Sequence, residues 1–107
     1  MQSDQLRGHL DMLLLAVLAT GPAHGYAVAA ELRRRSNGEL AVLEGSLCPA
    51  LHRLEAAGLI GSVNETIGGR RRRSYEITAD GKTALDDDRA AWEQFRQCID
   101  TILETSS

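Results

Sequence analysis

The chain has 107 residues, of which 43% are hydrophobic and 25% charged, and it contains two cysteines and one tryptophan. This length fits one small globular domain, and the composition argues against a disordered chain or a disulfide-stabilised secreted scaffold. The net charge of −3 is uneven, because residues 1–75 carry nine arginines and seven acidic residues, whereas residues 76–107 carry three basic and eight acidic ones. A basic body of this kind favours an anionic partner despite the acidic total.

The apolar run MLLLAVLA at residues 12–19 is the only stretch that resembles a targeting segment. It is too short to cross a bilayer, which takes about 20 apolar residues. The residues before it include Asp4 and Asp11 against one arginine, so the basic start of a signal peptide is missing. We therefore expect a cytoplasmic protein without a membrane partner.

Apolar spacing predicts three helices in the first half of the chain. The first covers residues 5–20 and ends at a Gly-Pro pair. Its apolar surface is wider than one stripe, which indicates contacts on more than one side. The second runs over 25–36, where three arginines near its end suit the helix dipole. The third covers 45–57 and ends at Gly58. We expect it to begin close to Pro49, because proline is tolerated best in the first turn.

A β-hairpin and a long helix follow. Two β-rich runs at 59–67 and 72–78 are joined through a Gly-Gly pair, which accepts the positive φ of a tight turn. Thr78 is placed to cap a fourth helix that extends to about residue 104. Three helices followed by a hairpin predict a mostly α fold, a winged helix-turn-helix. We expect residues 1–78 to form this DNA-binding domain and 79–107 a C-terminal dimerisation helix.

The third helix has an apolar face and a face of small, weakly polar residues. Leu47, Leu51 and Leu54 share the side that we expect to be buried. The opposite side carries the exposed set Gly45, Cys48, Pro49, His52, Arg53 and Ala56. Small outward residues permit close approach to the major groove, and His52 and Arg53 could reach a base edge or a phosphate. A plain surface helix remains the alternative.

The four consecutive arginines at 70–73 favour DNA more strongly. Because side chains alternate along a strand, Arg71 and Arg73 continue one face of the hairpin and Arg70 and Arg72 the other. A protruding finger with guanidinium groups on both faces can follow a phosphate backbone or enter the minor groove. The alternative is a solvated tip, for which a mixture of lysine and glutamate would serve better.

Three segments together resemble one known family. They are GPAHGYAVAAEL (21–32), EGSLCPALHRLEAAGLI (44–60) and GGRRRRSYEITADGKTAL (68–85), which are similar to the PadR family of transcriptional regulators. The resemblance implies a homodimer, usually a repressor, on a palindromic double-stranded DNA operator, and the length is similar to its short subfamily with one C-terminal helix. The positions that it implies as DNA-binding are Tyr26, Ser46, Pro49, His52, Arg53, Arg72 and Arg73.

The sequence departs from the family pattern at two positions. Cys48 stands where members commonly carry a tyrosine that often contacts DNA, so the resemblance implies no such contact at this position. Leu43 stands where members carry serine or proline, which removes a good helix cap. We expect Ser46 to replace part of that cap.

The last helix carries a heptad seam that predicts dimerisation. Its members repeat at a and d positions and are interrupted by Asp88. The seam could pack on the chain's own first helix, but a two-fold dimer through both helices covers more apolar surface. The expected interface residues are Leu6, Leu10, Leu85, Trp92, Phe95, Ile99 and Ile102. Since some members of the family bind flat aromatic compounds between these helices, the resemblance also implies a small aromatic effector near Trp92, Phe95, Leu10 and Leu14.

Other functions have weaker support. No histidine has a paired carboxylate or nucleophile at convincing spacing, so we expect no enzyme. Cys48 and His52 lie four residues apart and offer two metal ligands, but a site normally needs three or four, and we expect no cofactor. A metal- or thiol-responsive regulator of the same fold, and a winged helix that binds protein without DNA, remain alternatives.

Overall fold

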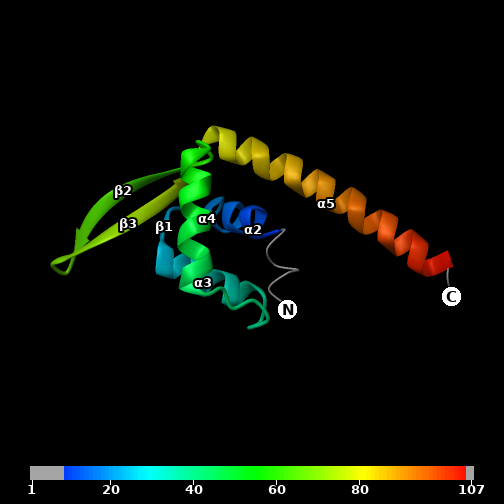
Figure 1. The fold of residues 1–107 in the computed structure, drawn as a ribbon, viewed down its shortest axis with the longest axis horizontal. Helices are drawn as coiled ribbons and strands as arrows, with labels where there is room; N and C mark the ends of the chain where they lie inside the picture. The colour runs from blue at the N-terminus through cyan, green and yellow to red at the C-terminus, as the bar shows by residue number, and fades with distance from the viewer. Residues whose placement is uncertain (1–8, 106–107) are drawn as a thin grey trace.

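The helices, the hairpin and the long last helix follow one another in the order that the sequence predicts. The computed structural model describes residues 9–105 (Figure 1). The helices are α2 (Leu10–Leu18), α3 (Gly25–Arg35), α4 (Glu44–Ala56) and α5 (Ala79–Thr105), and the strands are β1 (Ala23–His24), β2 (Ile60–Ile67) and β3 (Arg70–Ile77). The strands form an antiparallel sheet in the order β1-β3-β2. The prediction of a mostly α winged helix-turn-helix with a long C-terminal helix is confirmed.

Helix α2 lies at the centre of the core. It contacts α3, α4, α5 and β3, and Leu14 and Leu15 are almost completely buried. This explains why its apolar surface is wider than one stripe, since neighbours cover it on several sides. The leucines predicted to face inward from α4 are buried as well, at 2% exposure or less. The core is therefore aliphatic, with Tyr75 as its one buried aromatic residue among those described.

The first helix is shorter than the predicted 5–20. It begins at Leu10, since His9 has φ −123° and ψ −2°, and it ends at Leu18. The hydroxyl of Thr20 donates to the carbonyl of Val17 at 2.8 Å, a local bond that favours a turn over another helical residue. The predicted residues 5–8, and with them Leu6, lie outside the described part of the chain.

Strand β1 has no counterpart among the elements that the sequence predicts. Ala23 and His24 pair with Tyr75 and Ser74 of β3, and so add a third strand to the predicted hairpin. Two residues cannot display an alternating pattern, so no periodicity reveals such a strand. The pairing fixes the entrance to α3 beside the base of the hairpin.

The start of α4 differs from the prediction in two respects. Leu43 is the N-cap and no side chain caps the helix, so Ser46 does not replace the missing cap. The backbone amides of Ser46 and Leu47 instead both donate to the carbonyl of Leu43, at 2.9 and 3.0 Å. Pro49 lies five residues after the first helical residue, deeper than expected. Its missing N–H leaves the carbonyl of Gly45 without a helical donor, which the exposure of that glycine makes tolerable.

The end of α4 is closed by a turn of the Schellman type. The amide of Leu59 donates to the carbonyl of Leu54 at 2.9 Å, and the amide of Gly58 to that of Glu55 at 3.0 Å. Gly58 has φ +77°, a conformation that glycine adopts without strain. The chain then enters β2 directly, so helix α4 and the hairpin are joined by a short connection.

The hairpin and the cap of α5 form as predicted. Gly68 and Gly69, with φ +57° and +80°, make the two-residue turn between β2 and β3. Thr78 accepts a hydrogen bond from the amide of Gly81 at 3.0 Å, which caps the first turn of α5. Its own hydroxyl donates to the carbonyl of Gly58 at 2.7 Å, and so ties α5 to the turn after α4. We call β2, β3 and their turn the wing.

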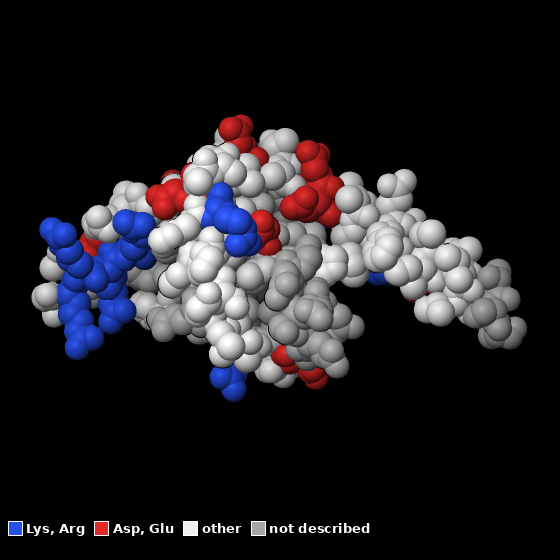
Figure 2. Space-filling view, in the orientation of Figure 1, with Lys and Arg blue, Asp and Glu red and all other residues white. Residues whose placement is uncertain are grey.

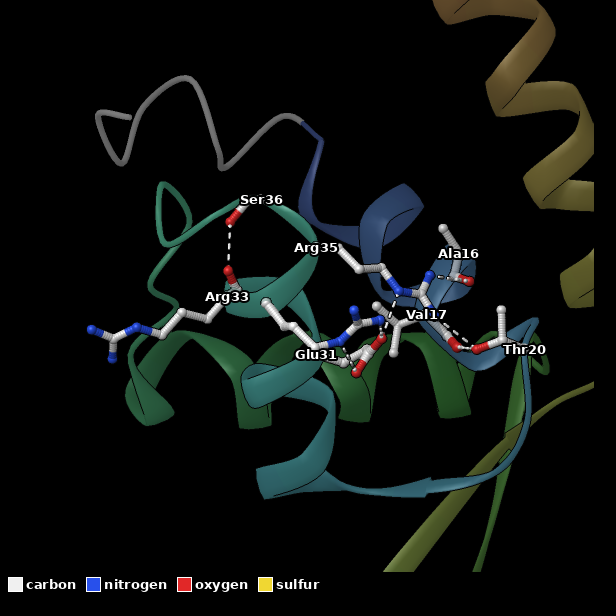
Figure 3. Close-up of polar contacts among 8 residues, drawn as sticks. Ala16, Val17, Thr20, Glu31, Arg33, Arg35 and Ser36 are labelled. Carbon is white, nitrogen blue, oxygen red and sulfur yellow. Dashed lines mark hydrogen bonds and ion pairs between the residues drawn. The ribbon is translucent and has the colours of Figure 1, made fainter.

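The arginines at the end of α3 include a structural anchor (Figure 3). Arg35 donates through Nη2 to the hydroxyl of Thr20 at 2.8 Å and through Nη1 to the carbonyl of Ala16 at 3.5 Å, so it satisfies groups at the end of α2. Glu31 pairs with Arg34 and with Arg35, the latter at 2.9 Å. The hydrogen bonds from Arg34 and Arg35 lower the pKa of Glu31 to about 2.

Candidate nucleic-acid interface

Helix α4 presents the predicted small face to solvent. Cys48, Pro49 and His52 are exposed, together with Gly45 and Ala56 on the same side. None of these side chains is large enough to keep a groove wall at a distance. Ser46 is exposed at the N-terminal end of the helix, where it adds a hydroxyl to this face. The helix can therefore lie close to a flat or grooved partner.

Arg53, the one arginine of α4, pairs with a carboxylate of another helix. Its Nη2 atom lies 2.9 Å from Oδ1 of Asp11 on α2, and both side chains are about half exposed. An exposed pair of this kind contributes little to stability, so a stronger anion can replace Asp11. The pair links residues 42 positions apart, which no sequence pattern indicates.

The wing tip carries two adjacent arginines that face solvent. Arg70 and Arg71 are exposed, and neither has an ion-pair partner within residues 9–105. Figure 2 shows the arginine side chains gathered at the end of the hairpin, away from the acidic groups near the start of α5. Arginines without carboxylates are free to contact an anion, because no intramolecular bond has to break first.

Arg72 packs against an aromatic stack at the side of the wing. Its guanidinium carbon lies 4.9 Å from the ring centroid of Tyr26, which is 60% exposed at the start of α3. The ring of His24 stacks with the ring of Tyr26 at 5.7 Å between centroids and with an interplanar angle of 3°. His24 Nε2 lies 3.0 Å from Oε2 of Glu65, the residue opposite Arg72 in the β2–β3 register. Tyr26 and Arg72, implied as DNA-binding by the resemblance, are thus brought into contact.

Arg73 is directed toward α4. Its Nη1 atom lies 3.8 Å from Oε1 of Glu55, which also accepts a hydrogen bond from the hydroxyl of Ser62. The sequence does not predict these partners, Asp11 for Arg53 and Glu55 for Arg73. The i, i+3 and i, i+4 rules find pairs within a helix, but pairs between elements depend on the tertiary fold.

The described residues include no group of three or more His, Cys, Asp and Glu side chains that could hold a metal ion. Cys48 and His52 are both exposed on α4, and the described chain adds no third ligand beside them. None of the described helices has the length and apolar character needed to cross a membrane. His24 does have a carboxylate partner in Glu65, but this pair lies in the stack beside the wing.

A pocket of about 430 Å³ lies between α2 and α5. Its walls are His9, Asp11, Met12, Asp88, Ala91, Trp92 and Phe95. Trp92 contacts His9 edge-on at 5.1 Å and Phe95 at 6.1 Å between ring centroids. Leu10 and Leu14, which we expected beside the effector, are 6% and 0% exposed in the core and do not line this pocket.

Only the later part of the heptad seam is exposed. Leu85 is 3% exposed and packs within the chain, in agreement with contacts between α5 and α2. Trp92, Phe95 and Ile102 are 40%, 55% and 59% exposed. Within one chain the alternative of packing on the first helix therefore holds for the start of α5, whereas Trp92, which contacts His9, and the later residues of the seam remain exposed.

Comparisons with known proteins find similarity to transcriptional regulators. A sequence model described as "Transcriptional regulator PadR-like family" matches residues 14–87. A transcriptional regulator of Mycobacterium tuberculosis is 39% identical over 88 residues, which cover 82% of this chain and 79% of that protein. The solved structure of a transcriptional regulator from Clostridium thermocellum has a TM-score of 0.87 and 29% identity, covering 92% of this chain and 97% of that chain.

A structure of Bacillus subtilis PadR in complex with operator DNA is a more distant neighbour. Its TM-score is 0.67 at 23% identity, covering 73% of this chain and 45% of that chain, so it supports the fold alone. The matching family and these neighbours are transcriptional regulators, not enzymes.

Proposed function

Because the chain belongs to the PadR-like family of transcriptional regulators, we propose that it binds double-stranded operator DNA through helix α4 and the wing. The observation that carries this proposal is a pair of wing-tip arginines with no ion-pair partner among residues 9–105, on a wing that follows a helix whose exposed face carries small side chains. We assign base reading to Ser46, Pro49, His52 and Arg53 on α4. We assign phosphate contacts to Arg70, Arg71, Arg72 and Arg73, with the ring of Tyr26 in contact with Arg72.

The ion pairs of the interface modify these assignments. Arg53 has to exchange Asp11 for a phosphate or a base, whereas Arg73 can keep its Nη1 contact with Glu55 and turn its other N–H groups to a phosphate. Arg70 and Arg71 do not have to break an ion pair within residues 9–105 before they contact DNA. We therefore expect them to contribute most of the wing's affinity for DNA. Because phosphate contacts release counterions, binding weakens as salt rises, with a slope of about 0.9 per contact.

The experiment is a titration of duplex DNA at several salt concentrations. Changing Arg70 and Arg71 to alanine should weaken binding to specific and random duplexes together and flatten the salt slope by up to about two units. Arg33→Ala, which removes an exposed arginine at the other end of α3, is the matched control and should leave the slope unchanged. A protein that binds no duplex at low salt would favour the protein-interaction alternative.

The finer proposals concern assembly and regulation. We propose that residues 79–107 form a dimerisation helix for the DNA-binding domain at 1–78, through Trp92, Phe95, Ile99 and Ile102. Leu10 and Leu85 support this surface from within each chain. A dimer places two α4 helices on two half-sites, as a palindromic operator requires. The regulator is then a repressor that an effector releases from DNA.

The pocket between α2 and α5 supports a site for that effector. It combines the flat rings of Trp92 and Phe95 with the carboxylates of Asp11 and Asp88, which favours a planar aromatic cation over an anion. Asp11 also pairs with Arg53, so the pocket and α4 share one side chain. The test is fluorescence of the single tryptophan during titration with planar cationic dyes, measured together with release of DNA.

A further inference from the structure

The carboxylate of Glu55 joins helix α4 to both strands of the wing. Glu55 lies near the end of α4, and its Oε2 atom accepts a hydrogen bond from the hydroxyl of Ser62 on β2. Its Oε1 atom lies 3.8 Å from Nη1 of Arg73 on β3. Since its two oxygens have partners on different strands, one side chain holds the base of the wing at two points.

The backbone connection between α4 and the wing is short and lies at one end of the hairpin. It consists of the turn at Gly58 and Leu59, after which β2 continues for eight residues, Ile60–Ile67. At about 3.3 Å per residue, the tip lies roughly 25 Å from this turn. A rotation of about 10° at the base therefore moves the tip arginines by roughly 4 Å, more than a hydrogen bond tolerates. A side-chain attachment between α4 and the wing therefore has a large effect on where the tip lies.

We propose that Glu55 is a positioning residue that fixes the direction of the wing relative to α4, so that both reach one duplex at the spacing of a specific site. This inference rests on the proposed DNA binding. It also gives Arg73 an intramolecular role in the free protein, which leaves Arg70 and Arg71 as the tip contacts.

The negative charge of Glu55 makes it possible to distinguish a role in positioning the wing from a direct contribution to DNA affinity. A carboxylate beside a DNA interface repels phosphate, so Glu55 lowers affinity for every duplex to the same degree. Any benefit of Glu55 for DNA recognition must therefore appear in specificity, which is the ratio of the affinities for a selected and a random duplex. Loss of the positioning contact should lower that ratio even where total affinity rises.

Ser62 allows a test that leaves charge unchanged. Ser62→Ala removes the hydrogen bond to Glu55, and Ser62→Thr keeps a hydroxyl at the same place on β2. The probes are a duplex selected by the unaltered protein from a randomised pool, and the unselected pool itself. We expect Ser62→Ala to lower the specificity ratio roughly fivefold, the equivalent of one hydrogen bond, with affinity for the unselected pool and the salt slope unchanged. Ser62→Thr should restore the ratio.

Glu55→Gln provides a second test that remains valid if Ser62→Ala folds poorly. It removes the ion pair with Arg73, so affinity for the unselected pool should rise and the specificity ratio should fall. The matched control is Glu76→Gln, which removes an equal charge from an exposed position on β3 that has no ion-pair partner among the described residues. The control should raise affinity for both duplexes equally and leave the ratio unchanged.

The outcomes separate this inference from the proposed function. If the unaltered protein selects no duplex, binding to an operator is itself overturned. If it selects one, but Ser62→Ala and Glu55→Gln keep its ratio, then Glu55 does not position the wing. Equal losses in Ser62→Ala and Ser62→Thr would also overturn the inference, since packing and not the hydroxyl would then be responsible.

Discussion

Arg53 and Arg73 each lie beside a carboxylate, whereas Arg70 and Arg71 at the wing tip have no such partner within residues 9–105. The same residue type therefore has different roles within one basic surface. A guanidinium held by Asp11 or Glu55 is preoriented, but Arg53 must exchange Asp11 for another anion when it binds DNA. For exposed pairs this exchange costs little, about 1 kcal/mol or less.

Asp11→Asn tests whether Arg53 reaches DNA. The change releases Arg53 and removes a negative charge beside α4. We expect tighter binding to random duplexes and a salt slope steeper by up to about 0.9, the contribution of one phosphate contact. Asp86→Asn removes an equal charge from an exposed position on α5 and should leave the slope unchanged. The same slope in both variants would mean that Arg53 does not contact phosphate.

Glu31 gives the chain a defined response to acid. Hydrogen bonds from Arg34 and then Arg35 lower its pKa from the usual 4.5 to about 2. A carboxyl whose pKa is lowered by folding contributes stability above its unfolded pKa, and that contribution is lost as pH falls from about 4.5 to 2. Carboxyl titration followed by NMR should show Glu31 ionised through pH 3.5, roughly one unit below the usual value. Arg34→Gln should raise its midpoint more than Arg35→Gln; the opposite order would contradict the assignment of Arg34 as the main cause.

At the scale of elements, the sequence predicted what depends on local periodicity. The order of helices, the Gly68-Gly69 turn and the Thr78 cap all follow from residues close together in the chain. Strand β1 could not be predicted, because its two residues gain their conformation from pairing with β3. The partners of Arg53 and Arg73 were missed for the same reason, since contacts between elements leave no spacing in the sequence.

The junction of α4, the wing and α5 depends on a glycine. A Cβ atom at Gly81 would lie 2.0 Å from the carbonyl oxygen of Leu59 and 2.7 Å from Cγ1 of Ile77. Because one of these atoms belongs to the backbone, the contact cannot be relieved by a side-chain rotation. Close packing of the first turn of α5 on the turn after α4 therefore requires glycine here.

Gly81→Ala should destabilise the protein, although alanine usually stabilises a helix by about 1 kcal/mol relative to glycine. We expect a loss of roughly 1–3 kcal/mol in the free energy of unfolding, the usual cost of overpacking, measured by urea denaturation. Gly45→Ala in α4 is the control, since its Cβ would meet no heavy atom within 4 Å. That variant should be neutral or slightly more stable. A gain in stability for both variants would show that the junction can open without cost.

The whole molecule is long, with principal extents of 59 × 28 × 20 Å, because α5 leaves the body (Figure 1). The wing and the end of α5 lie at opposite ends of the longest axis. Contacts between α2 and α5 cover Leu85, but Trp92, Phe95 and Ile102 remain exposed beyond them. The arrangement separates a basic end from an apolar arm, and an apolar arm of this kind favours association with a second copy.

Charged residues introduced on the exposed seam should separate the two chains of the proposed dimer without unfolding either chain. Phe95 and Ile102 are 55% and 59% exposed in a single chain, so replacing both by glutamate removes little intramolecular packing. In a dimer the same change would bury four carboxylates, which is strongly unfavourable. Sedimentation velocity at micromolar concentration should give a dimer for the unaltered protein and a folded monomer for the double variant. The control Ala90→Glu, which changes an exposed residue on the opposite side of the heptad, should remain dimeric.

The monomer should also bind a palindromic duplex much more weakly than the dimer, because two linked α4 helices raise the effective concentration at the second half-site. A double variant that stays dimeric would place the interface elsewhere than on this seam.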